Sequence, residues 1–528
     1  MSSKKANKLD DPTMHYVTLH GDQRTVDGEV RDTQDLATVF ENHPRAGDVV
    51  QVLAGKYWPL IETQNENLEV VPRAIEIRGL RGTRDRPITI RGLGKQTILC
   101  GSNAAVPLYP DLPDRRHFAF FKLIDCEWVI IESFSVESCW PCFVYLEASR
   151  HITVRDIEAV DSLYLIFARG RLCHHLLIED NDWSQDPSGA VWRHLDWVDV
   201  HHGDYRYLNG GLFGSEGITG SVVVRRNRVR DAYNVIRMVA DRGDAREQTN
   251  LNVEIYENEF TRIRDNVVEP EGNAINWWVH HNRIENCHAW FSLDGVSGGY
   301  RYIFSNLGWF NDWPGQPKDD NKGGKVLKFA KRSLYNQDHP TFVFHNSWFL
   351  RIYVAKKGLT ERFHHWGNAI RYCDPEGFEG AICQLRTGLV SDDFLGDGWQ
   401  DSVFFDHDLC NRPFGDKLIN NGQEENGTVD PEFQFVNPRD GDLRPALPDI
   451  PAAAPIVLKA GEDWPGSSDW SSASEGDNIK VGAWQDAELM RGPSFVFYDP
   501  GLEEIDYADE GGADEIYWRA DHRSGISG

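Results

Sequence analysis

Basic residues are scarce in this sequence. Among its 528 residues, 55 lysines and arginines stand against 82 aspartates and glutamates, which gives a formal net charge of −27 at pH 7. General nucleic-acid binders neutralise phosphates with clustered Lys and Arg, so this charge argues against that function. The sequence also lacks any run of about 18 uncharged apolar residues, the length that a transmembrane helix needs. Neither a nucleic acid nor a membrane is therefore an expected partner.

Cysteine is sparse and irregularly spaced. The nine cysteines are an odd number spread over a long chain, which excludes the dense disulfide framework of a small secreted domain. We expect reduced, mostly buried thiols. The start, MSSKKANKLDDPTMHYVTLHG, contains no apolar segment, so we expect no signal peptide in it. The expected location is cytoplasmic or virion-associated, or secreted or periplasmic if a signal sequence has been removed.

A short phrase that ends in asparagine recurs between residues 176 and 346. It reads LLIEDN, VVVRRN, VEIYEN, WWVHHN, YIFSN and FVFHN, and the residue three positions before each asparagine is apolar. The six asparagines are Asn181, Asn227, Asn258, Asn282, Asn306 and Asn346. Their spacings of 46, 31, 24, 24 and 40 residues predict the coils of a β-solenoid, in which the shortest unit is about one coil and the longer units carry inserted loops.

Asparagines at equivalent turns can stack on one another. Stacked amides satisfy hydrogen bonds that a buried turn would otherwise leave open, so we predict a structural role for all six. Upstream, VIIESFSV (129–136) continues the strand pattern, and DTQDLATVFEN (32–42) places Leu36, Val39 and Phe40 at helical spacing. The latter segment is predicted to be an amphipathic helix that caps the first coil.

Four stretches of sequence carry a resemblance to a known group of proteins. AGDVVQVLAGKYW (46–58) and RPITIRGLGKQTILCGS (86–102) resemble the first coils of right-handed parallel β-helix proteins of the pectate-lyase-like group. DPEFQFVNPRDGDLRP (430–445) and IKVGAWQ (479–485) are similar to the closing coils of the same group. The resemblance, together with the recurring phrase, predicts an all-β protein.

The predicted architecture is one right-handed parallel β-helix with inserted loops over residues 14–485. A flexible N-terminus (1–13) precedes it, and an acidic tail (486–528) follows it. The resemblance implies a long shallow groove along one parallel sheet, in which an extended glycan lies across several coils. The 18 Trp, 17 Tyr and 26 Phe exceed what a solenoid core needs, and aromatic faces are common sugar platforms. We therefore expect a polysaccharide substrate.

Charged residues follow the turns in a common register. The segments NVIRM, NVVEPEG, WFSLDG and KVLKFAK place Arg237, Glu269 and Lys328 on successive coils, with Ser292 or Leu293 between the last two. Charged side chains do not enter a solenoid core without cost, so we predict an outward column; the alternative is a solvated face without function. Three further carboxylates are expected at the edges of the column: Asp265, Glu271 and Asp294.

This column suits chemistry on a uronate. β-Elimination and C5 epimerisation need a cation that neutralises the carboxylate and a base that removes the C5 proton. Arg237 and Lys328 are the candidates, and Lys328 works as a base only if its pKa is lowered. The segment 318–332, which includes Lys325, has a local charge of +4 and would attract an anionic polymer, or it is a flexible loop between coils. Trp290 and Asp294 are further candidate substrate contacts.

Glu269 and Glu271 are two positions apart and share one face of a strand, with α-carbons about 6.6 Å apart at ~3.3 Å per residue. The pair suits a glycoside hydrolase, whose two carboxyl groups lie about 5–9.5 Å apart. With Asp265, it can instead hold Ca²⁺ through oxygen ligands. The Glu-x-Glu resembles that of chondroitinase B and alginate lyase relatives, which implies calcium held against the substrate carboxylate. No lysine follows in the same strand, and Pro270 removes a ladder donor, so the sequence departs from that pattern.

Histidines and carboxylates gather in RHLDWVDVHHGD (193–204), inside the longest early insertion. His201 and His202 are predicted to overhang the groove as an acid or a base, because inserted loops carry function on rigid scaffolds. The alternative is a Zn²⁺ site, although no recognised ligand spacing is present. His364 and His365, in ERFHHWGN, are weaker candidates of the same kind.

The leading function is cleavage by β-elimination, or C5 epimerisation, of an anionic uronate polysaccharide. A glycoside hydrolase that uses the paired carboxylates is the nearest alternative. The fold also admits a non-catalytic carbohydrate-binding or virion tailspike-like fibre protein, which the resemblance implies would assemble as a trimer. The sugar, its linkage and the oligomeric state have no readable signal in the sequence.

Overall fold

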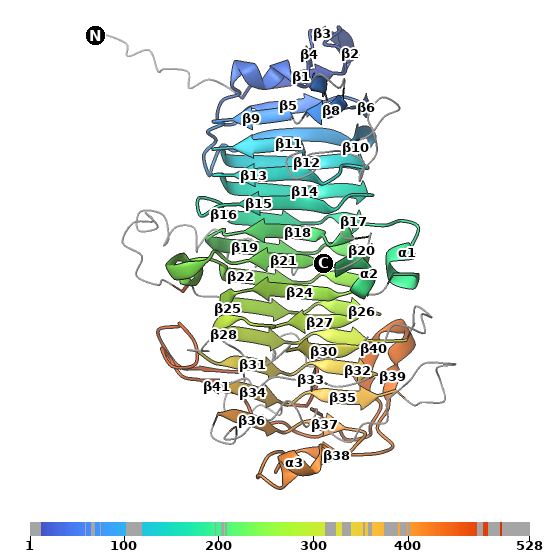
Figure 1. Ribbon diagram of the computed structural model, residues 1–528, viewed down its shortest axis with the longest axis vertical. Helices are drawn as coiled ribbons and strands as arrows, with labels where there is room; N and C mark the ends of the chain where they lie inside the picture. The colour runs from blue at the N-terminus through green and yellow to red at the C-terminus, as the bar shows by residue number, and fades with distance from the viewer. Residues whose placement is uncertain are drawn as a thin grey trace, which may run out of the picture.

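The computed structural model describes residues 12–58, 60–64, 69–73, 75–101, 119–195, 197–201, 205, 208–311, 324–329, 339–351, 354–356, 362–373, 389–390, 399, 402–472, 479–483 and 497–498. Within these ranges, no helix is long and apolar enough to cross a membrane. Parallel strands stack into a solenoid whose first coils lie at one end and whose last coils lie at the other (Figure 1). The predicted right-handed parallel β-helix is confirmed.

The two main sheets run the length of the solenoid. The first has ten strands: β9 (Ile75–Arg78), β11 (Ala119–Ile124), β13 (Cys142–Glu147), β15 (Tyr164–Arg169), β18 (Gly211–Glu216), β21 (Ile236–Val239), β24 (Asn266–Glu271), β27 (Ala289–Ser292), β30 (Lys325–Lys328) and β33 (Ala355–Lys356).

The second sheet has 24 strands: β1 (Met14–Thr18), β4 (Gln34–Asp35), β5 (Val49–Val52), β6 (Gly55–Tyr57), β10 (Ile88–Cys100), β12 (Glu127–Glu137), β14 (Arg150–Val160), β16 (His174–Glu179), β17 (Asp182–Ser184), β19 (Gly220–Arg225), β20 (Arg228–Ala232), β22 (Leu251–Tyr256), β23 (Glu259–Ile263), β25 (Asn273–His280), β26 (Arg283–Glu285), β28 (Ser297–Phe304), β29 (Leu307–Trp309), β31 (Thr341–Phe344), β32 (Ser347–Leu350), β34 (Phe363–Trp366), β35 (Ala369–Tyr372), β36 (Val403–Asp406), β37 (Leu409–Cys410) and β38 (Thr428–Val429).

From β16 onward a typical coil supplies two short strands to the larger sheet and one to the ten-stranded sheet, as in β19, β20 and β21. The long strands β10, β12 and β14 span both positions of the larger sheet, and β14 pairs with both β16 and β17.

Short elements lie outside the two main sheets. They are the strand pairs β2 (Arg24–Val26) with β3 (Glu29–Arg31), β7 (Leu60–Gln64) with β8 (Glu69–Arg73), β39 (Phe435–Asn437) with β40 (Asp442–Pro445) and β41 (Val457–Leu458) with β42 (Trp470–Ser471), the helices α1 (Ala190–Arg193), α2 (Trp197–His201) and α3 (Asp416–Ile419), and the 3₁₀ helices η1 (Thr38–Asn42), η3 (Gly243–Gln248) and η6 (Pro438–Asp440).

The expected N-terminal capping helix takes a shorter form. Residues 32–42 contain β4 and the 3₁₀ helix η1, and Leu36, Val39 and Phe40 are buried. The Phe40 ring lies 6.4 Å from that of Phe121 in the first coils, measured between centroids. The capping function of this segment stays a prediction.

The asparagine ladder is present as predicted. Each ladder asparagine donates a hydrogen bond from Nδ2 to the Oδ1 of the asparagine in the next coil, at 2.9–3.0 Å. The residue before each one has a left-handed backbone, from Asp180 (φ 55°) to His345 (φ 51°), which forms the turn. The ladder continues into Asn368 and ends at Asp408. Sequence analysis missed Asn368 because His365 stands where the phrase requires an apolar residue, and it missed Asp408 because the phrase there ends in aspartate.

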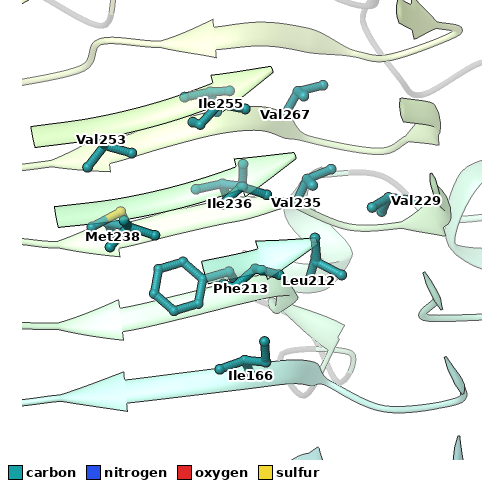
Figure 2. Close-up of a cluster of buried hydrophobic side chains, with 14 of the residues drawn as sticks. Ile166, Leu212, Phe213, Val229, Val235, Ile236, Met238, Val253, Ile255 and Val267 are labelled. Atoms are coloured by element: carbon teal, nitrogen blue, oxygen red, sulfur yellow. The ribbon is translucent and has the colours of Figure 1, made fainter. Parts of the chain in front are cut away.

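The interior of the solenoid is filled by side chains from the inward positions of both sheets. Ile236, Met238, Val253 and Ile255 lie stacked there (Figure 2), and all are fully buried. Because successive residues of a strand point to opposite sides, every second residue is left for the outer faces. All eight cysteines within the described ranges are free and buried, as expected; Cys383 lies outside these ranges.

Part of the outer face of the larger sheet, over β22, β25, β28 and β31, is covered by the C-terminal part of the chain. Trp278, Tyr302 and Phe342 form an aromatic cluster there, and Leu458 and Trp464 pack onto it. The hydroxyl of Tyr302 donates a hydrogen bond to the Asp463 carbonyl at 2.9 Å. Further along, the backbone of Tyr498 exchanges hydrogen bonds with the Asn252 side chain. The described C-terminal segments therefore run along this sheet.

Candidate functional site

The outer face of the ten-stranded sheet carries the predicted column. Arg237 in β21 pairs with Glu269 in β24, and Ser292 in β27 pairs with Lys328 in β30. The pairing of β24 with β27 sets Glu269 beside Ser292. The predicted register is confirmed, and Ser292, rather than Leu293, occupies the column.

Alternation along the strands points these side chains outward. Ile236 and Met238, on either side of Arg237, lie inside the solenoid (Figure 2). The side chains of Arg237, Glu269 and Lys328 are 27%, 13% and 23% exposed. The column is therefore half-buried, an environment in which charges interact more strongly than in water.

Glu269 lies at the centre of the column. Its Oε1 accepts a hydrogen bond from Asn266 Nδ2 at 2.6 Å, and its Oε2 is 3.6 Å from Arg237 Nε. The Arg237 guanidinium also binds Glu271 Oε1 at 2.7 Å. Burial, reinforced by the Asp265 carboxylate, raises the pKa of Glu269 to about 8. At neutral pH the Glu269 carboxyl is thus largely protonated and can donate a proton.

Lys328 reaches back from β30 to the carboxylates of earlier coils. Its Nζ lies 3.7 Å from Asp265 Oδ1 and 3.8 Å from Asp294 Oδ2, and it donates a hydrogen bond to Asn266 Oδ1 at 3.3 Å. Burial opposes the charge, but the carboxylates of Asp265, Glu269 and Asp294 outweigh it and raise the pKa of Lys328. A base would need the opposite shift, so the expectation that Lys328 removes a proton is corrected: it is a cation.

Asp265 is the most deeply buried carboxylate of the group. Its side chain is 2% exposed, and neither oxygen accepts a hydrogen bond from the described residues. A carboxylate in this condition depends on nearby positive charge. Lys328 supplies that charge on one side, and His201 approaches from the other.

His201 comes from the insertion between β17 and β18. The insertion is anchored because Val191, Leu195 and Val200 pack against Tyr233 of the solenoid. The His201 Nδ1 is 2.9 Å from the Tyr233 hydroxyl, and its Nε2 is 3.8 Å from Asp265 Oδ2. The insertion therefore brings an imidazole to the column, as predicted for His201, whereas His202 lies outside the described residues.

Two expected substrate contacts lie elsewhere. Trp290 has no exposed surface: it packs against Trp348 in the core, with centroids 5.1 Å apart, and donates Nε1 to the Cys287 carbonyl. The expectation that it forms a sugar platform is corrected: although strict alternation would turn Trp290 outward like Ser292, its ring lies in the core together with that of Phe291, at the start of β27. Lys325 is buried at 7% exposure, which removes it as a surface contact, and the remaining basic residues of 318–332 other than Lys328 lie outside the described residues.

An aromatic patch that sequence analysis missed lies on the same face, on earlier coils. The rings of Tyr145 and Phe167 stack at 5.9 Å, and Tyr164 packs edge-on to Phe167 at 5.1 Å. Gly214 makes room for them, since a β-carbon there would lie 2.4 Å from the Tyr164 ring. Lys122 lies over the Tyr145 ring at 5.5 Å. The sequence gives no signal for this patch, because YLIFAR (164–169) is apolar from Tyr164 to Ala168 and shows no alternation.

The expected calcium ligands do not form a ready-made cage. Glu271 binds Arg237, Asp265 faces Lys328, and Glu269 is largely protonated at neutral pH. Among the described residues, Asp265, Glu269 and Glu271 are not a group whose ligand atoms all lie within 4.8 Å of one another. The three do not fit a Ca²⁺ ion in this arrangement, because the chain's own cations already neutralise them.

Comparisons with known proteins find likeness in fold. No protein-family profile matches the chain, and no curated protein matches its sequence. Similar solved structures include pectate lyase Pel9A (11% identity, TM-score 0.41, covering 90% of this chain and 97% of that chain) and XylC in complex with xylose (12%, 0.45, 89% and 98%). A mutant of the PL6 family alginate lyase AlyGC is also similar (12%, 0.40, 87% and 57%). The resemblance to the pectate-lyase-like group is thus one of fold, and it assigns no activity.

Proposed function

We propose that this protein cleaves an acidic polysaccharide by β-elimination at a uronate residue. One observation carries the proposal: Glu269, a carboxyl whose pKa burial raises to about 8, lies between Arg237 and Lys328 in one column on the outer face of a parallel β-helix. Elimination next to a carboxylate needs such cations, because negative charge builds up on that carboxylate when the C5 proton leaves.

Each step of the reaction has a candidate residue. Lys328 and Arg237 neutralise the uronate carboxylate, and His201 takes the C5 proton. The electron pair of the C5–H bond forms the C4=C5 double bond while the C4–O4 bond breaks, and the departing O4 takes the proton of Glu269. If the proton returned to the opposite face of C5 instead, the product would be the C5 epimer.

The spacing of the strands suggests that the polymer lies across the coils, parallel to the axis of the solenoid. Neighbouring strands lie about 4.8 Å apart, which is close to the length of one sugar unit. A chain laid across the coils would therefore pass from the column to Phe167, the partly exposed ring of the aromatic patch, against which the buried Tyr145 and Tyr164 pack. Lys122, beside that patch, would meet the carboxylate of a more distant sugar.

Calcium stays part of the proposal only as an ion that arrives with the substrate. Asp265 and Glu271 would be its protein ligands, with Glu269 joining them only in its ionised form, and a uronate carboxylate would complete the oxygen shell that Ca²⁺ requires. The bound ion would add positive charge at the substrate carboxylate. An activity that is unaffected by EDTA would remove calcium from the proposal and leave the role of Arg237 and Lys328 intact.

The deciding experiment measures ultraviolet absorbance of 4,5-unsaturated uronates over a panel of anionic polysaccharides, with and without Ca²⁺ or EDTA. The expected result is a product that Lys328→Ala and Arg237→Ala both abolish. Lys95→Ala is the matched control, because that lysine is 80% exposed on the larger sheet. Unsaturated product that survives both substitutions would contradict the assigned site.

A glycoside hydrolase is the second candidate, and the raised pKa of Glu269 favours it. A carboxyl that is protonated at neutral pH suits a general acid, with Asp265 as its partner carboxylate. New reducing ends without ultraviolet absorbance would select this function. Absence of both products, with retained polysaccharide binding and a trimer by light scattering, would select the fibre protein.

A further inference from the structure

Two departures from the recurring phrase coincide at the C-terminal end of the solenoid. In six coils the residue three positions before the ladder asparagine is Ile or Val, but before Asn368 it is His365. In the next coil the ladder asparagine itself is replaced by Asp408, which accepts the last ladder hydrogen bond at 3.0 Å. Both positions point into the solenoid, where a polar residue needs a specific partner.

The two residues that depart from the phrase, His365 and Asp408, contact each other. His365 Nδ1 lies 2.5 Å from Asp408 Oδ2, and both side chains are 0% exposed. A third polar residue, Glu424, comes from the chain that closes this end of the solenoid, and its Oε2 accepts a hydrogen bond from the Asp408 backbone at 3.2 Å. Gly427 leaves room for that carboxylate, since a β-carbon there would lie 2.4 Å from Glu424 Oε2.

One oxygen of this group is unsatisfied. Glu424 is 4% exposed, and its Oε1 has no hydrogen-bond partner among the described residues. One ligand atom from each of His365, Asp408 and Glu424 lies within 4.8 Å of the others, and within the described ranges this is the only such group of three His, Cys, Asp or Glu residues. With both carboxylates ionised, this buried group holds more negative charge than one imidazolium can offset, and a bound cation would balance the excess.

We propose that His365, Asp408 and Glu424 bind a divalent transition-metal ion of the zinc class as a buried, structural site. One imidazole and two carboxylates are ligands that zinc accepts, at about 2.0–2.2 Å. The ion would replace the hydrogen bond between His365 and Asp408, and their ligand atoms would separate to about 3.3 Å, as tetrahedral coordination requires. It would join β34 and the turn between β36 and β37 to the closing segment around Glu424, and a water molecule would take the fourth position, which burial keeps away from any substrate.

Two substitutions distinguish a bound metal ion from a buried hydrogen-bond network that contains no metal. Glu424→Gln keeps the shape of a protonated glutamate but removes the charge of a ligand. The adjacent, exposed Glu425→Gln is the matched control. Each full-length protein is purified without chelator, incubated with Zn²⁺, dialysed, and measured for metal content and for melting temperature with and without EDTA.

The expected result is about one zinc per chain in wild type and in Glu425→Gln, and none in Glu424→Gln. EDTA should lower the melting temperature of the two metal-binding proteins by about 5 °C or more, and leave Glu424→Gln unchanged. If Glu424→Gln does not fold, Co²⁺ added to the metal-free wild type decides: visible absorption of tetrahedral Co²⁺ supports the site. Wild type that takes up neither Zn²⁺ nor Co²⁺ overturns the proposal, whatever the stability of Glu424→Gln.

Discussion

The outer faces of the two main sheets are built by the same alternation and have opposite characters. On the larger sheet the outward residues include Trp278, Tyr302 and Phe342, which the C-terminal segment buries. On the ten-stranded sheet they include Arg237 and Lys328, which stay 27% and 23% exposed. The difference shows that a solenoid supplies two platforms, and that the C-terminal segment packs onto one of them and leaves the charged column of the other partly exposed.

The sharpest test of this division is Trp278→Ala. The side chain is 1% exposed under the C-terminal segment, and truncating such a tryptophan should lower the free energy of unfolding by about 3–5 kcal/mol. Chemical denaturation measures the loss. Activity of the folded protein at low temperature should be unchanged, and a parallel loss of activity would mean that the two faces are not separate.

Glu269→Gln tests the opposite face. On the proposed reaction it should lower kcat by about 10²–10⁴-fold, because an amide donates no proton to the leaving group. Circular dichroism should show an unaltered fold. Wild-type activity should fall above about pH 8, where Glu269 ionises. An activity that keeps rising through pH 9 would exclude Glu269 as the acid.

The same carboxyl should make stability depend on pH. Its pKa rises from 4.5 in the unfolded chain to about 8 in the folded one, so folding favours its protonated form. This contribution is fully present below pH 4.5 and is lost as the pH rises through 8. The melting temperature of Glu269→Gln, relative to wild type, should therefore increase between pH 5 and pH 8. A constant difference would contradict the raised pKa.

Asn282→Ala tests the ladder that both faces share. It leaves the Asn258 Nδ2 without its acceptor in the next coil and removes one donor from the Asn306 Oδ1. The expected cost is about 1–3 kcal/mol per unsatisfied buried group, measured by denaturation. Asn421→Ala, at an exposed position, is the control and should change stability by less than about 0.5 kcal/mol.

Lys122→Ala should have the smallest effect. The lysine lies near the aromatic patch, about 4 Å from Glu76 and Glu147, and its removal takes away one charge from the proposed path of the polymer. We expect KM to rise by about two- to fivefold on long substrates, with kcat unchanged, because half-exposed ion pairs contribute less than about 1 kcal/mol. An equal effect on short oligosaccharides would show that Lys122 acts within the reaction centre.

Much of the site could be predicted because it repeats along the chain. Spacing from the turn asparagines was enough to align Arg237, Glu269 and Lys328, since each coil restarts the register. The protonation of Lys328 could not be predicted in this way, because it depends on Asp265 and Asp294 from other coils. Trp290 was misassigned for a related reason: the sequence alone does not show whether an aromatic residue in a strand points into the core or toward the outer face.

By itself the sequence determined the solenoid, the asparagine ladder and the column of charges, because all three follow from periodicity along the chain. Only the tertiary structure decided that His201 meets Asp265, that the C-terminal segment covers part of the larger sheet, and that His365, Asp408 and Glu424 converge. These contacts join insertions, distant coils and the closing segment, and their geometry depends on packing rather than on a repeat. Local periodicity sets the register of neighbouring strands, whereas burial and charge act between residues that the folded chain brings together.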